Sequence, residues 1–440
     1  MNISRRTMLA GSAAALAGPL LASRPALPRA GTGSASTGSA STGSASTGSA
    51  STVPVRQAAG QAAAQTAATV VMSIQNNTLS DTVFAFVSGQ AIDNGNALML
   101  LEADGETPYY PASPSGTGSP LAVDCAIPLN ASGGAPVTIT VPHLAGARLW
   151  FSIGSPLTFL LNPGPALVEP SVTNPSDPNI SLPWDFAEFT YNDAELFANI
   201  TFVDFVSIPV ALTLTDTAGN QQAAAGLPRG GLDTVCAGLA AQAAADGNPW
   251  TDLIVTSGGQ NLRALSPAQG ITVNPSFLSG YFDDYAGQAW AKYADTALTV
   301  DTQASYGTVT GQVSGGLLTF SGVGSFAQPA TADIFSCDSG PFSPAGMSAG
   351  MLAIVPRLAA AFNRSTLLTD ADQPDGENPA GYYANPVTNH YARIVHATSL
   401  DGRGYAFPYD DVAPTGGADQ SGAVSSGSPA QLAITLGAVH

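Results

Sequence analysis

Apolar residues are spaced in two ways along the chain, and the change in spacing divides it into regions. Between residues 70 and 180, short apolar runs alternate with turn-forming pairs such as Asn-Gly, Gly-Gly and Pro-Gly. Short β-branched and aromatic runs between turn signals are typical of an all-β sandwich or barrel. The predicted strands cover residues 70–74, 82–87, 98–101, 137–141, 149–153 and 157–161.

Beyond residue 214 the runs become longer and richer in alanine, which indicates helices mixed with short strands. We expect helices at residues 232–245, 275–293, 346–362 and 385–398, and strands near 253–255, 297–300, 306–320, 404–411 and 431–435. The predicted fold class is α+β, with a β-barrel or sandwich domain at 70–225, to which 400–440 return, and a mixed α/β domain at 226–399. A cleft between them is the expected ligand site, because domain junctions favour ligand binding.

The N-terminal residues are similar to a targeting segment. Residues 4–9, SRRTML, resemble the twin-arginine export signature, and a weakly apolar Ala/Gly/Leu run follows to residue 22. That run contains a proline and is shorter than the roughly 20 apolar residues of a spanning helix. We therefore predict a signal peptide at residues 1–30, a secreted protein and no membrane contact in the mature form. Repeated TGSAS units and an Ala-rich segment predict a flexible linker over 31–69.

The charge of the chain restricts its partners. It carries 31 acidic residues against 13 basic ones, and all of the acidic residues follow residue 69. Such an acidic surface repels nucleic acid and anionic membranes, so neither is an expected partner. Only 10% of the residues are charged, so much of the polar surface must come from Asn, Gln, Ser and Thr. That surface suits a neutral, hydroxyl-rich ligand such as a polysaccharide, and it also suits any exported protein.

Cysteines and histidines give no sign of a metal or redox site. Cys125, Cys236 and Cys337 are too few for a disulfide framework, and none lies in a C-x-x-C spacing. At most one disulfide can form, so at least one thiol is expected to be free. His390 and His396 are off a common helical face, and the chain has no H-E-x-x-H motif. We expect no metal and no cofactor.

One motif points to a different enzyme class. Residues 346–350, GMSAG, match the G-x-S-x-G elbow of α/β-hydrolases. That elbow requires a buried strand that leads directly into the serine. Residues 338–345 are rich in Gly, Ser and Pro and cannot form a central strand. We therefore interpret the motif as the N-terminal cap of a helix and keep esterase activity as an alternative.

Two carboxylates interrupt apolar strips between residues 184 and 209. Aromatic residues at 184–191 and β-branched ones at 199–208 predict two strands. Because side chains alternate between faces, Glu188 shares a face with aromatic residues and Asp204 with apolar ones. Cleavage of a glycosidic bond needs two such carboxyl groups, one as acid and one as base or nucleophile. Carboxylate pairs also occur in structural networks, so the pattern alone leaves both interpretations open.

Four further stretches belong with this one: residues 174–179 (NPSDPN), 362–368 (FNRSTLL), 388–393 (TNHYAR) and 405–411 (YAFPYDD). Together they resemble glycoside hydrolase family 64, the laminaripentaose-producing β-1,3-glucanases, over about residues 70–440. The last stretch is also similar to the closing motif of thaumatin-like proteins, so a thaumatin-like β domain is expected. The resemblance implies endo-cleavage of β-1,3-glucan in a wide groove between the two domains, with inversion and release of a five-glucose product.

The resemblance also implies roles for single residues. Glu188 corresponds to the family's general acid, and Asp204 corresponds to its base in both residue type and spacing. The implied substrate-binding residues are Thr190, Asn192, Phe197, Thr201, Asp410 and Asp411. The family has a tryptophan where this chain has Phe197, which removes an indole N–H and part of a stacking surface for sugar.

The distance between the two carboxylates decides between arrangements of the strands. An inverting enzyme holds them roughly 6.5–9.5 Å apart, whereas simple pairing of the strands would put Glu188 and Asp204 roughly 5 Å apart. Either the strands pair in another register or the side chains diverge. We expect a monomeric, secreted endo-β-1,3-glucanase that acts on β-1,3-glucan without a cofactor; the alternative is a non-catalytic thaumatin-like β-glucan-binding protein.

Overall fold

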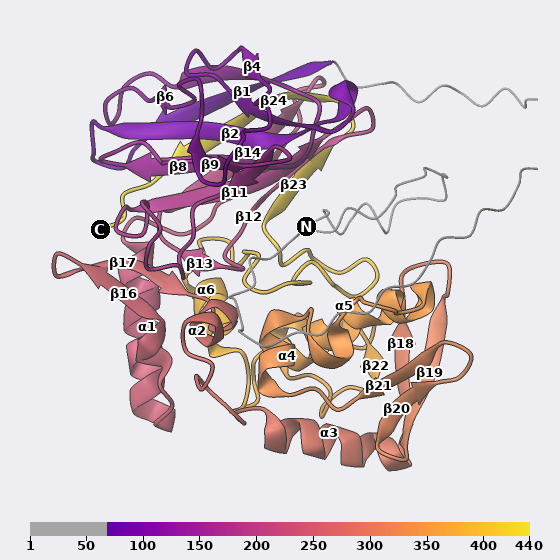
Figure 1. The fold of residues 1–440 in the computed structure, drawn as a ribbon. Coiled ribbons are helices and arrows are strands. Elements are labelled where there is room, and N and C mark those ends of the chain that lie inside the picture. The colour runs from indigo at the N-terminus through magenta and orange to yellow at the C-terminus, as the bar shows by residue number, and fades with distance from the viewer. Residues whose placement is uncertain (1–67) are drawn as a thin grey trace, which may run out of the picture. The chain divides into compact units, whose positions relative to one another are not determined.

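The computed structural model describes residues 68–440 (Figure 1). The predicted signal peptide and nearly all of the predicted linker lie outside these residues. The first strand, β1 (Thr69–Asn76), begins where the linker was expected to end. No helix in the described range is long and apolar enough to cross a membrane.

Two sheets form most of the region predicted as the β domain, residues 70–225 and 400–440, which is called the β part below. Strands from the C-terminal residues belong to both sheets. The five-stranded sheet has the order β15 (Gln221–Ala224), β14 (Val210–Asp216), β24 (Pro429–Leu436), β1 and β7 (Val137–Pro142). The larger sheet has the order β23 (Ala423–Ser426), β12 (Leu196–Ile200), β11 (Trp184–Tyr191), β8 (Leu144–Ile153), β2 (Val83–Ala91), β3 (Ala97–Leu101) and β4 (Pro108–Tyr109), with β6 (Ile127–Pro128) also on β2. The strand predicted at 431–435 is present as β24, which pairs parallel with β1 and antiparallel with β14.

Burial along the strands explains why these segments pair. In β1 the side chains of Val70, Met72 and Ile74 are buried, whereas Val71 is 38% exposed. This alternation is that of a strand with one face on the core. Most of β11 and much of β8 are buried on both faces, so these two strands lie inside the β part.

Three further sheets and the helices complete the described structure. The sheets are β10 (Ala166–Val168), β9 (Leu160–Asn162) and β5 (Ser119–Pro120); β13 (Phe205–Val206), β17 (Gln260–Leu265) and β16 (Ile254–Ser257); and β21 (Gly324–Ala327), β20 (Leu317–Phe320), β19 (Thr308–Ser314), β18 (Leu298–Asp301) and β22 (Asp372–Gln373). The α-helices are α1 (Gly231–Asp246), α2 (Pro267–Val273), α3 (Asp283–Asp295), α4 (Thr331–Ser336), α5 (Ala349–Arg364) and α6 (His390–Thr398). The mixed α and β content predicted from the sequence is thus confirmed.

The continuous strand predicted at residues 199–208 is wrong. β12 ends at Ile200, and the chain then leaves the larger sheet and pairs as β13 with β17. The backbone N–H groups of Ser207 and Ile208 donate to Oδ2 of Asp185, at 3.0 and 2.9 Å, and not to a neighbouring strand. The carboxylate of Asp185 therefore takes donors that a longer strand would have used.

Two other predictions need correction. Residues 404–411 are turns, with a single bridge between Thr201 and Tyr405, because the Asp410 carboxylate accepts the backbone N–H of Ala406 at 3.0 Å and closes a local loop. The helix predicted at 275–293 begins only at Asp283, and the short helix α2 before it was missed.

The GMSAG segment caps a helix, as predicted. Ser348 is the N-cap of α5, and its hydroxyl accepts a hydrogen bond from the Met351 N–H at 3.2 Å. The preceding segment contains a short 3₁₀ turn (Gly340–Phe342) and no strand leads into the serine. The structural requirement of a hydrolase elbow is therefore not met.

None of the three cysteines forms a disulfide in the structure, and all three are buried. The prediction of at least one free thiol is thus confirmed. The hydrophobic core is one cluster that includes residues of both the β part and the helical part. Polar contacts also join the two: Tyr391 Oη of α6 donates to the carbonyl of Phe202 at 2.7 Å.

Candidate active site

Arg148 and Glu188 face each other on adjacent strands. They are paired residues in the antiparallel ladder of β8 and β11, so their side chains lie on one face of the sheet. Nε and Nη2 of Arg148 are each 3.3 Å from Oε1 of Glu188, and Nη1 is 2.6 Å from Oε2 of Glu169. The guanidinium lies over the ring of Phe186, 4.6 Å from its centroid. Arg148 therefore binds two carboxylates while its planar group packs on an aromatic ring.

The third carboxylate near Arg148 is that of Asp204. Burial of the guanidinium lowers the pKa of Arg148, but the negative charges of Glu169, Glu188 and Asp204 outweigh it and raise that pKa above its ordinary value. One cation is thus surrounded by three acidic groups, two of which are the predicted catalytic pair. Such a concentration of opposed charges is frequent at functional sites and also occurs in structural networks.

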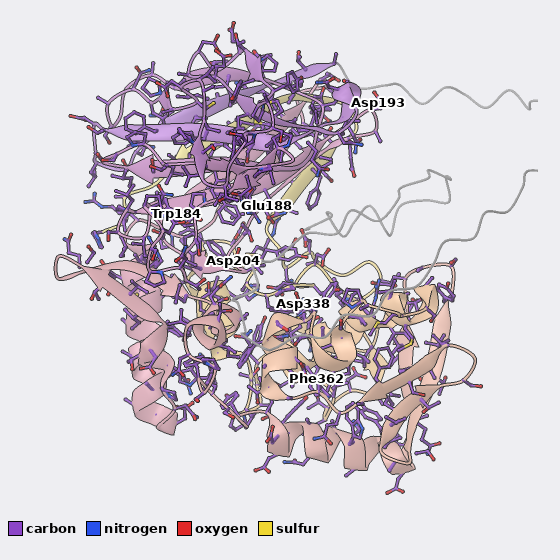
Figure 2. All side chains as sticks on the ribbon, in the orientation of Figure 1. Trp184, Glu188, Asp193, Asp204, Asp338 and Phe362 are labelled. Carbon is purple, nitrogen blue, oxygen red and sulfur yellow. The ribbon has the colours of Figure 1, made fainter. Side chains whose placement is uncertain are left out.

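Asp204 lies in the bend between β12 and β13. Its backbone carbonyl accepts the N–H of Ser266 at 2.9 Å, and its Oδ1 accepts a hydrogen bond from Nε2 of Gln269 at 2.7 Å. Ser266 directly follows β17 and caps α2, in which Gln269 lies. Glu188 and Asp204 are labelled in Figure 2, where they come from different elements.

The register of β11 and β12 settles the pairing of the two predicted strands. Glu188 is opposite Asn199, and the hairpin between them is tight, with Tyr191 opposite Leu196. Asp204 follows after β12 has ended at Ile200. The sequence left two arrangements open: another strand register, or diverging side chains. The structure confirms the other register, because Glu188 is paired with Asn199 and not with Asp204.

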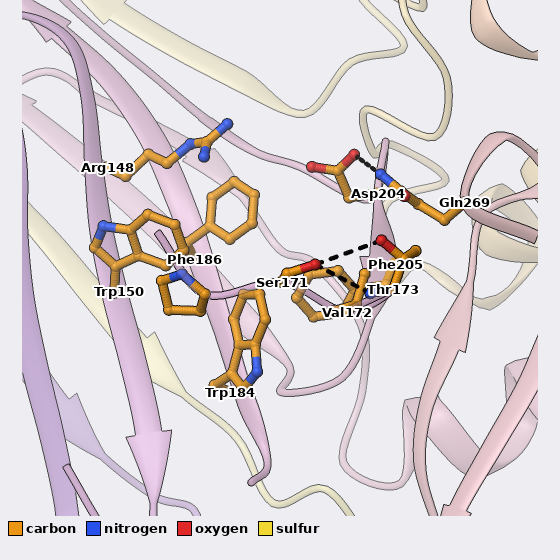
Figure 3. Close-up of a pocket in the computed structure, with 11 residues that line it drawn as sticks. Arg148, Trp150, Ser171, Val172, Thr173, Trp184, Phe186, Asp204, Phe205 and Gln269 are labelled. Carbon is orange, nitrogen blue, oxygen red and sulfur yellow. Dashed lines mark hydrogen bonds between the residues drawn. The ribbon is translucent and has the colours of Figure 1, made fainter. Parts of the chain in front are cut away.

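A pocket with a volume of about 140 Å³ opens beside Asp204 (Figure 3). Its wall combines aromatic rings, small hydroxyl side chains and the polar groups already described: Arg148, Trp150, Pro170, Ser171, Val172, Thr173, Trp184, Phe186, Asp204, Phe205 and Gln269. Arg148 lines this pocket and also binds Glu188, so Glu188 lies next to it. Aromatic faces with a few placed polar groups are typical of ligand pockets.

Three of the predicted substrate-binding residues lie on β11, on β12 or in the hairpin turn that joins these strands. Thr190 and Phe197 are a cross-strand pair of β11 and β12, and Thr190 Oγ1 accepts the N–H of Gly146 at 3.4 Å. Phe197 is 5% exposed. Asn192 lies in the hairpin turn, where its Oδ1 accepts the N–H groups of Ala194 and Glu195 at 2.8 and 3.0 Å.

Thr201, Asp410 and Asp411 lie near the C-terminal loop that follows α6. Thr201 is buried and forms the bridge to Tyr405. Asp411 is half-buried and accepts a hydrogen bond from the Tyr405 hydroxyl at 3.0 Å.

Asp410 has no exposed surface. Its carboxylate contacts Arg364 at 3.1 Å and His396 at 2.8 Å. This position does not support direct contact of Asp410 with a substrate, because Arg364 and His396 occupy its carboxylate and none of its side chain is exposed.

Sequence patterns do not identify three residues that contact the two carboxylates or their shared arginine: Arg148, Glu169 and Gln269. Arg148 carries a weak signal, since it is a basic residue directly before the apolar strand predicted at 149–153 in an acidic chain. Nothing in the spacing of Glu169 or Gln269 links them to Glu188 or Asp204. Among residues 68–440 no group of three or more His, Cys, Asp or Glu side chains is placed to hold a metal ion.

Two carboxylates on separate elements, beside a pocket lined by aromatic rings, form the arrangement expected of a glycoside hydrolase. A family model described as beta-1,3-glucanase matches residues 68–436, and the chain belongs to that family, glycoside hydrolase family 64. The chain is 33% identical over 308 residues to a glucan endo-1,3-beta-glucosidase of Cellulosimicrobium cellulans and 32% identical to one of Arthrobacter sp. (strain YCWD3). Each alignment covers 68% of this chain and 53% of the relative, so the chain spans about half the length of these relatives.

Solved structures share the fold. A laminaripentaose-producing beta-1,3-glucanase in complex with laminaritetraose superposes with a TM-score of 0.76 at 34% identity, covering 85% of this chain and all of that one. A beta-1,3-glucanase domain from Clostridium beijerinckii superposes with a TM-score of 0.66 over 84% of this chain and 98% of that domain. The identity to this domain is 22%, so this second likeness concerns the fold alone.

Proposed function

We propose that the protein is a secreted endo-β-1,3-glucanase that hydrolyses β-1,3-glucan with inversion and releases laminari-oligosaccharides, with laminaripentaose as the main product. Glu188 is the general acid and Asp204 the general base. The observation that carries the proposal is the placement of these carboxylates on separate elements around Arg148, with Asp204 in the wall of an aromatic-lined pocket. Family membership and the laminaritetraose-bound relative support the substrate class.

The two carboxylates divide the chemistry. Asp204 accepts a proton from a water molecule as that water attacks the anomeric carbon, and Glu188 gives its proton to the oxygen of the departing sugar. The water attacks the face opposite the leaving group, so the configuration at the anomeric carbon inverts. Asp204 is not the residue opposite Glu188 in the strand ladder, which agrees with the wider separation of carboxylates that an inverting reaction needs.

The glucan chain is proposed to lie in a wide groove between a thaumatin-like β-barrel and the α/β part. Thr190 and Phe197 form a neighbouring polar and apolar pair next to Glu188, which suits the edge and the face of a sugar ring. Thr201 and Asp411 lie on the segments that meet at the Thr201–Tyr405 bridge. Phenylalanine at position 197 offers a smaller stacking surface than tryptophan, so subsite affinity and product length are the properties it affects most.

The alternative function is non-catalytic binding of β-glucan. A thaumatin-like domain can keep an acidic cleft without turnover, and the ion pair between Arg148 and Glu188 would serve such a structural role equally well. Incubation with laminarin and with curdlan, followed by chromatography of the sugars, separates the two. The enzyme releases oligosaccharides and loses this activity in Asp204→Asn, whereas a binding module retains polysaccharide and releases none.

A further inference from the structure

We propose that Gln269 is a positioning residue for the base: its side-chain amide fixes the orientation of the Asp204 carboxylate, so that Oδ2 is presented to the attacking water. This inference rests on the proposed function, because it assigns Gln269 a role through Asp204 in that reaction.

The contact itself is short and directional. Nε2 of Gln269 lies 2.7 Å from Oδ1 of Asp204, and both residues line the same pocket (Figure 3). An amide NH₂ group can only donate, so Oδ1 is the acceptor in this bond. The bond holds the carboxylate plane in one rotation about χ2, a torsion that is otherwise broad. Oδ2 is then the oxygen that can receive the proton of a water molecule in the pocket.

The backbone around both residues keeps the bond in place. Ser266 donates its N–H to the carbonyl of Asp204 at 2.9 Å, and Phe205 and Leu265 are paired residues of β13 and β17. Asp204, directly before β13, accepts the hydrogen bond, and Gln269, in the helix that follows β17, donates it. The strand pair and the Ser266–Asp204 backbone bond therefore hold the backbones of Asp204 and of the start of α2 close together.

The helix that carries Gln269 is itself held closely. The Ser266 hydroxyl caps α2 by accepting the N–H of Gln269 at 3.4 Å, and Pro267 follows at the first helical position. Gly270 lets α2 approach its neighbours, because a Cβ at that position would lie 2.5 Å from Cδ2 of Leu253. A position fixed in this way is what a catalytic group requires of its supporting residues.

Arg148 cannot supply the same orientation. Its charge acts on Asp204, but its N–H groups are directed to Glu188 and Glu169. The amide of Gln269 is also neutral at every working pH, so it neither competes for the proton of water nor changes charge during turnover. Gln269 therefore orients the Asp204 carboxylate, whereas Arg148 places a positive charge near it.

The test compares Gln269→Ala and Gln269→Met with the wild type and with Gln242→Ala. Gln242 is a matched control, because its Nε2 also donates to an aspartate, Oδ2 of Asp246 at 2.9 Å, but on α1. We expect kcat on laminarin to fall about 10- to 100-fold in both Gln269 variants while KM changes less than about threefold, because the carboxylate is misoriented without loss of substrate contacts. Gln242→Ala should keep the wild-type kcat.

A substrate with an activated leaving group separates positioning of the base from a general loss of structure. An aryl laminari-oligosaccharide with an acidic phenol needs little protonation of its leaving oxygen, so it restores variants of the acid but not of the base. We expect the same fold-loss for Gln269→Ala on this substrate as on laminarin. An unchanged kcat in both Gln269 variants, or recovery on the aryl substrate, would overturn the inference.

Controls keep this outcome apart from failure of the proposed function. A wild type that releases no sugar overturns the proposed function, and an active Asp204→Asn overturns the assignment of the base. Unaffected Gln269 variants of an active enzyme overturn only the role of Gln269. Gln269→Met keeps the length of the side chain but has no N–H to donate, so it decides the matter if circular dichroism shows that Gln269→Ala is unfolded.

Discussion

Glu188 lies directly opposite Asn199 in the ladder of β11 and β12. β12 ends one residue later, and the chain passes through Thr201 into the bend that carries Asp204. The two carboxylates consequently come from different elements, one from the middle of a strand and one from the turn toward a separate sheet. A direct cross-strand pair would have placed them roughly 5 Å apart, too close for an intervening water in an inverting reaction.

Exchange of each carboxylate for its amide separates the two catalytic roles. We expect Asp204→Asn to be inactive on every substrate, because attack of water loses its base. Glu188→Gln should lose roughly 10²–10⁴-fold in kcat on laminarin, yet recover much of it on an aryl laminari-oligosaccharide with an acidic phenol. Initial rates on both substrates check this, and full activity of both variants would contradict the assignment.

The stereochemistry of the product is a separate prediction. Inversion of a β-glycosidic bond gives the α-anomer first. Proton NMR of the first products from laminarin, recorded before mutarotation, should therefore show the α-anomeric signal, and azide should not restore Asp204→Asn by forming a β-glycosyl azide. A β-anomer at the earliest times would mean a retaining mechanism.

Removal of the shared cation should destabilise the site. Arg148→Met leaves three acidic groups near one another without their counter-ion, in a place where the arginine side chain is 19% exposed. We expect the free energy of unfolding to fall by about 1–3 kcal/mol, the usual cost of losing a hydrogen-bonded partner of a charged group. Arg148→Lys keeps the charge but not the fork of N–H donors, so its free energy of unfolding should lie between those of the wild type and Arg148→Met. Urea denaturation measures all three proteins.

Local chemistry made much of the fold predictable. The short apolar runs at 70–74 and 431–435 predict β1 and β24, and the serine of the GMSAG segment is the helix cap that the sequence indicates. The helix α2 could also have been found, because Ser266 followed by Pro267 is an N-cap followed by a proline at the first helical position.

Long-range contacts explain what was not predicted. The strand expected at 199–208 breaks because Asp185, from another strand, accepts the N–H groups of Ser207 and Ile208. The strand expected at 404–411 is a loop because the buried Asp410 binds Arg364 and His396. Residue types and spacing indicated the carboxylate pair, but no spacing in the sequence connects Arg148 or Gln269 to it.

The thiols should be unreactive in the folded protein and all present after unfolding. Burial, together with nearby acidic charges, raises the pKa of Cys125 and that of Cys236 to about 12. A thiol reagent at neutral pH reacts with thiolate, so the native protein should react very slowly. In denaturant without reductant, all three thiols should titrate. A count of one would indicate a disulfide that the structure does not contain.

Export is tested in the cell that produces the protein. Replacement of Arg5 and Arg6 by lysine should leave the precursor in the cytoplasm, because the twin-arginine signature depends on the pair. Western blots of culture medium and cytoplasm measure the distribution. Unchanged secretion of the double variant would contradict a twin-arginine route and leave the glucanase proposal untouched.

His396 should make the stability of the protein depend on pH. Burial lowers the pKa of His396, but the charge of Asp410 and the hydrogen bonds to Asp410 and to the carbonyl of Gly402 outweigh it and raise that pKa above its ordinary value. A histidine with a raised folded-state pKa stabilises the fold fully below its unfolded pKa, and this contribution is lost as pH rises through the folded pKa. Each unit of the upward shift contributes about 1.4 kcal/mol.

His390, on the same helix, is the matched control. Burial, with the nearby charge of Arg393, lowers the pKa of His390, so its neutral form favours the fold and its contribution is lost as pH falls through the unfolded pKa. We expect the destabilisation by His396→Gln to shrink as pH rises from about 5.5 to about 9, and that by His390→Gln to grow, since the two pKa shifts have opposite signs. Urea unfolding at several pH values measures both. Parallel pH dependence of the two variants would show that the Asp410 carboxylate does not hold a proton on His396.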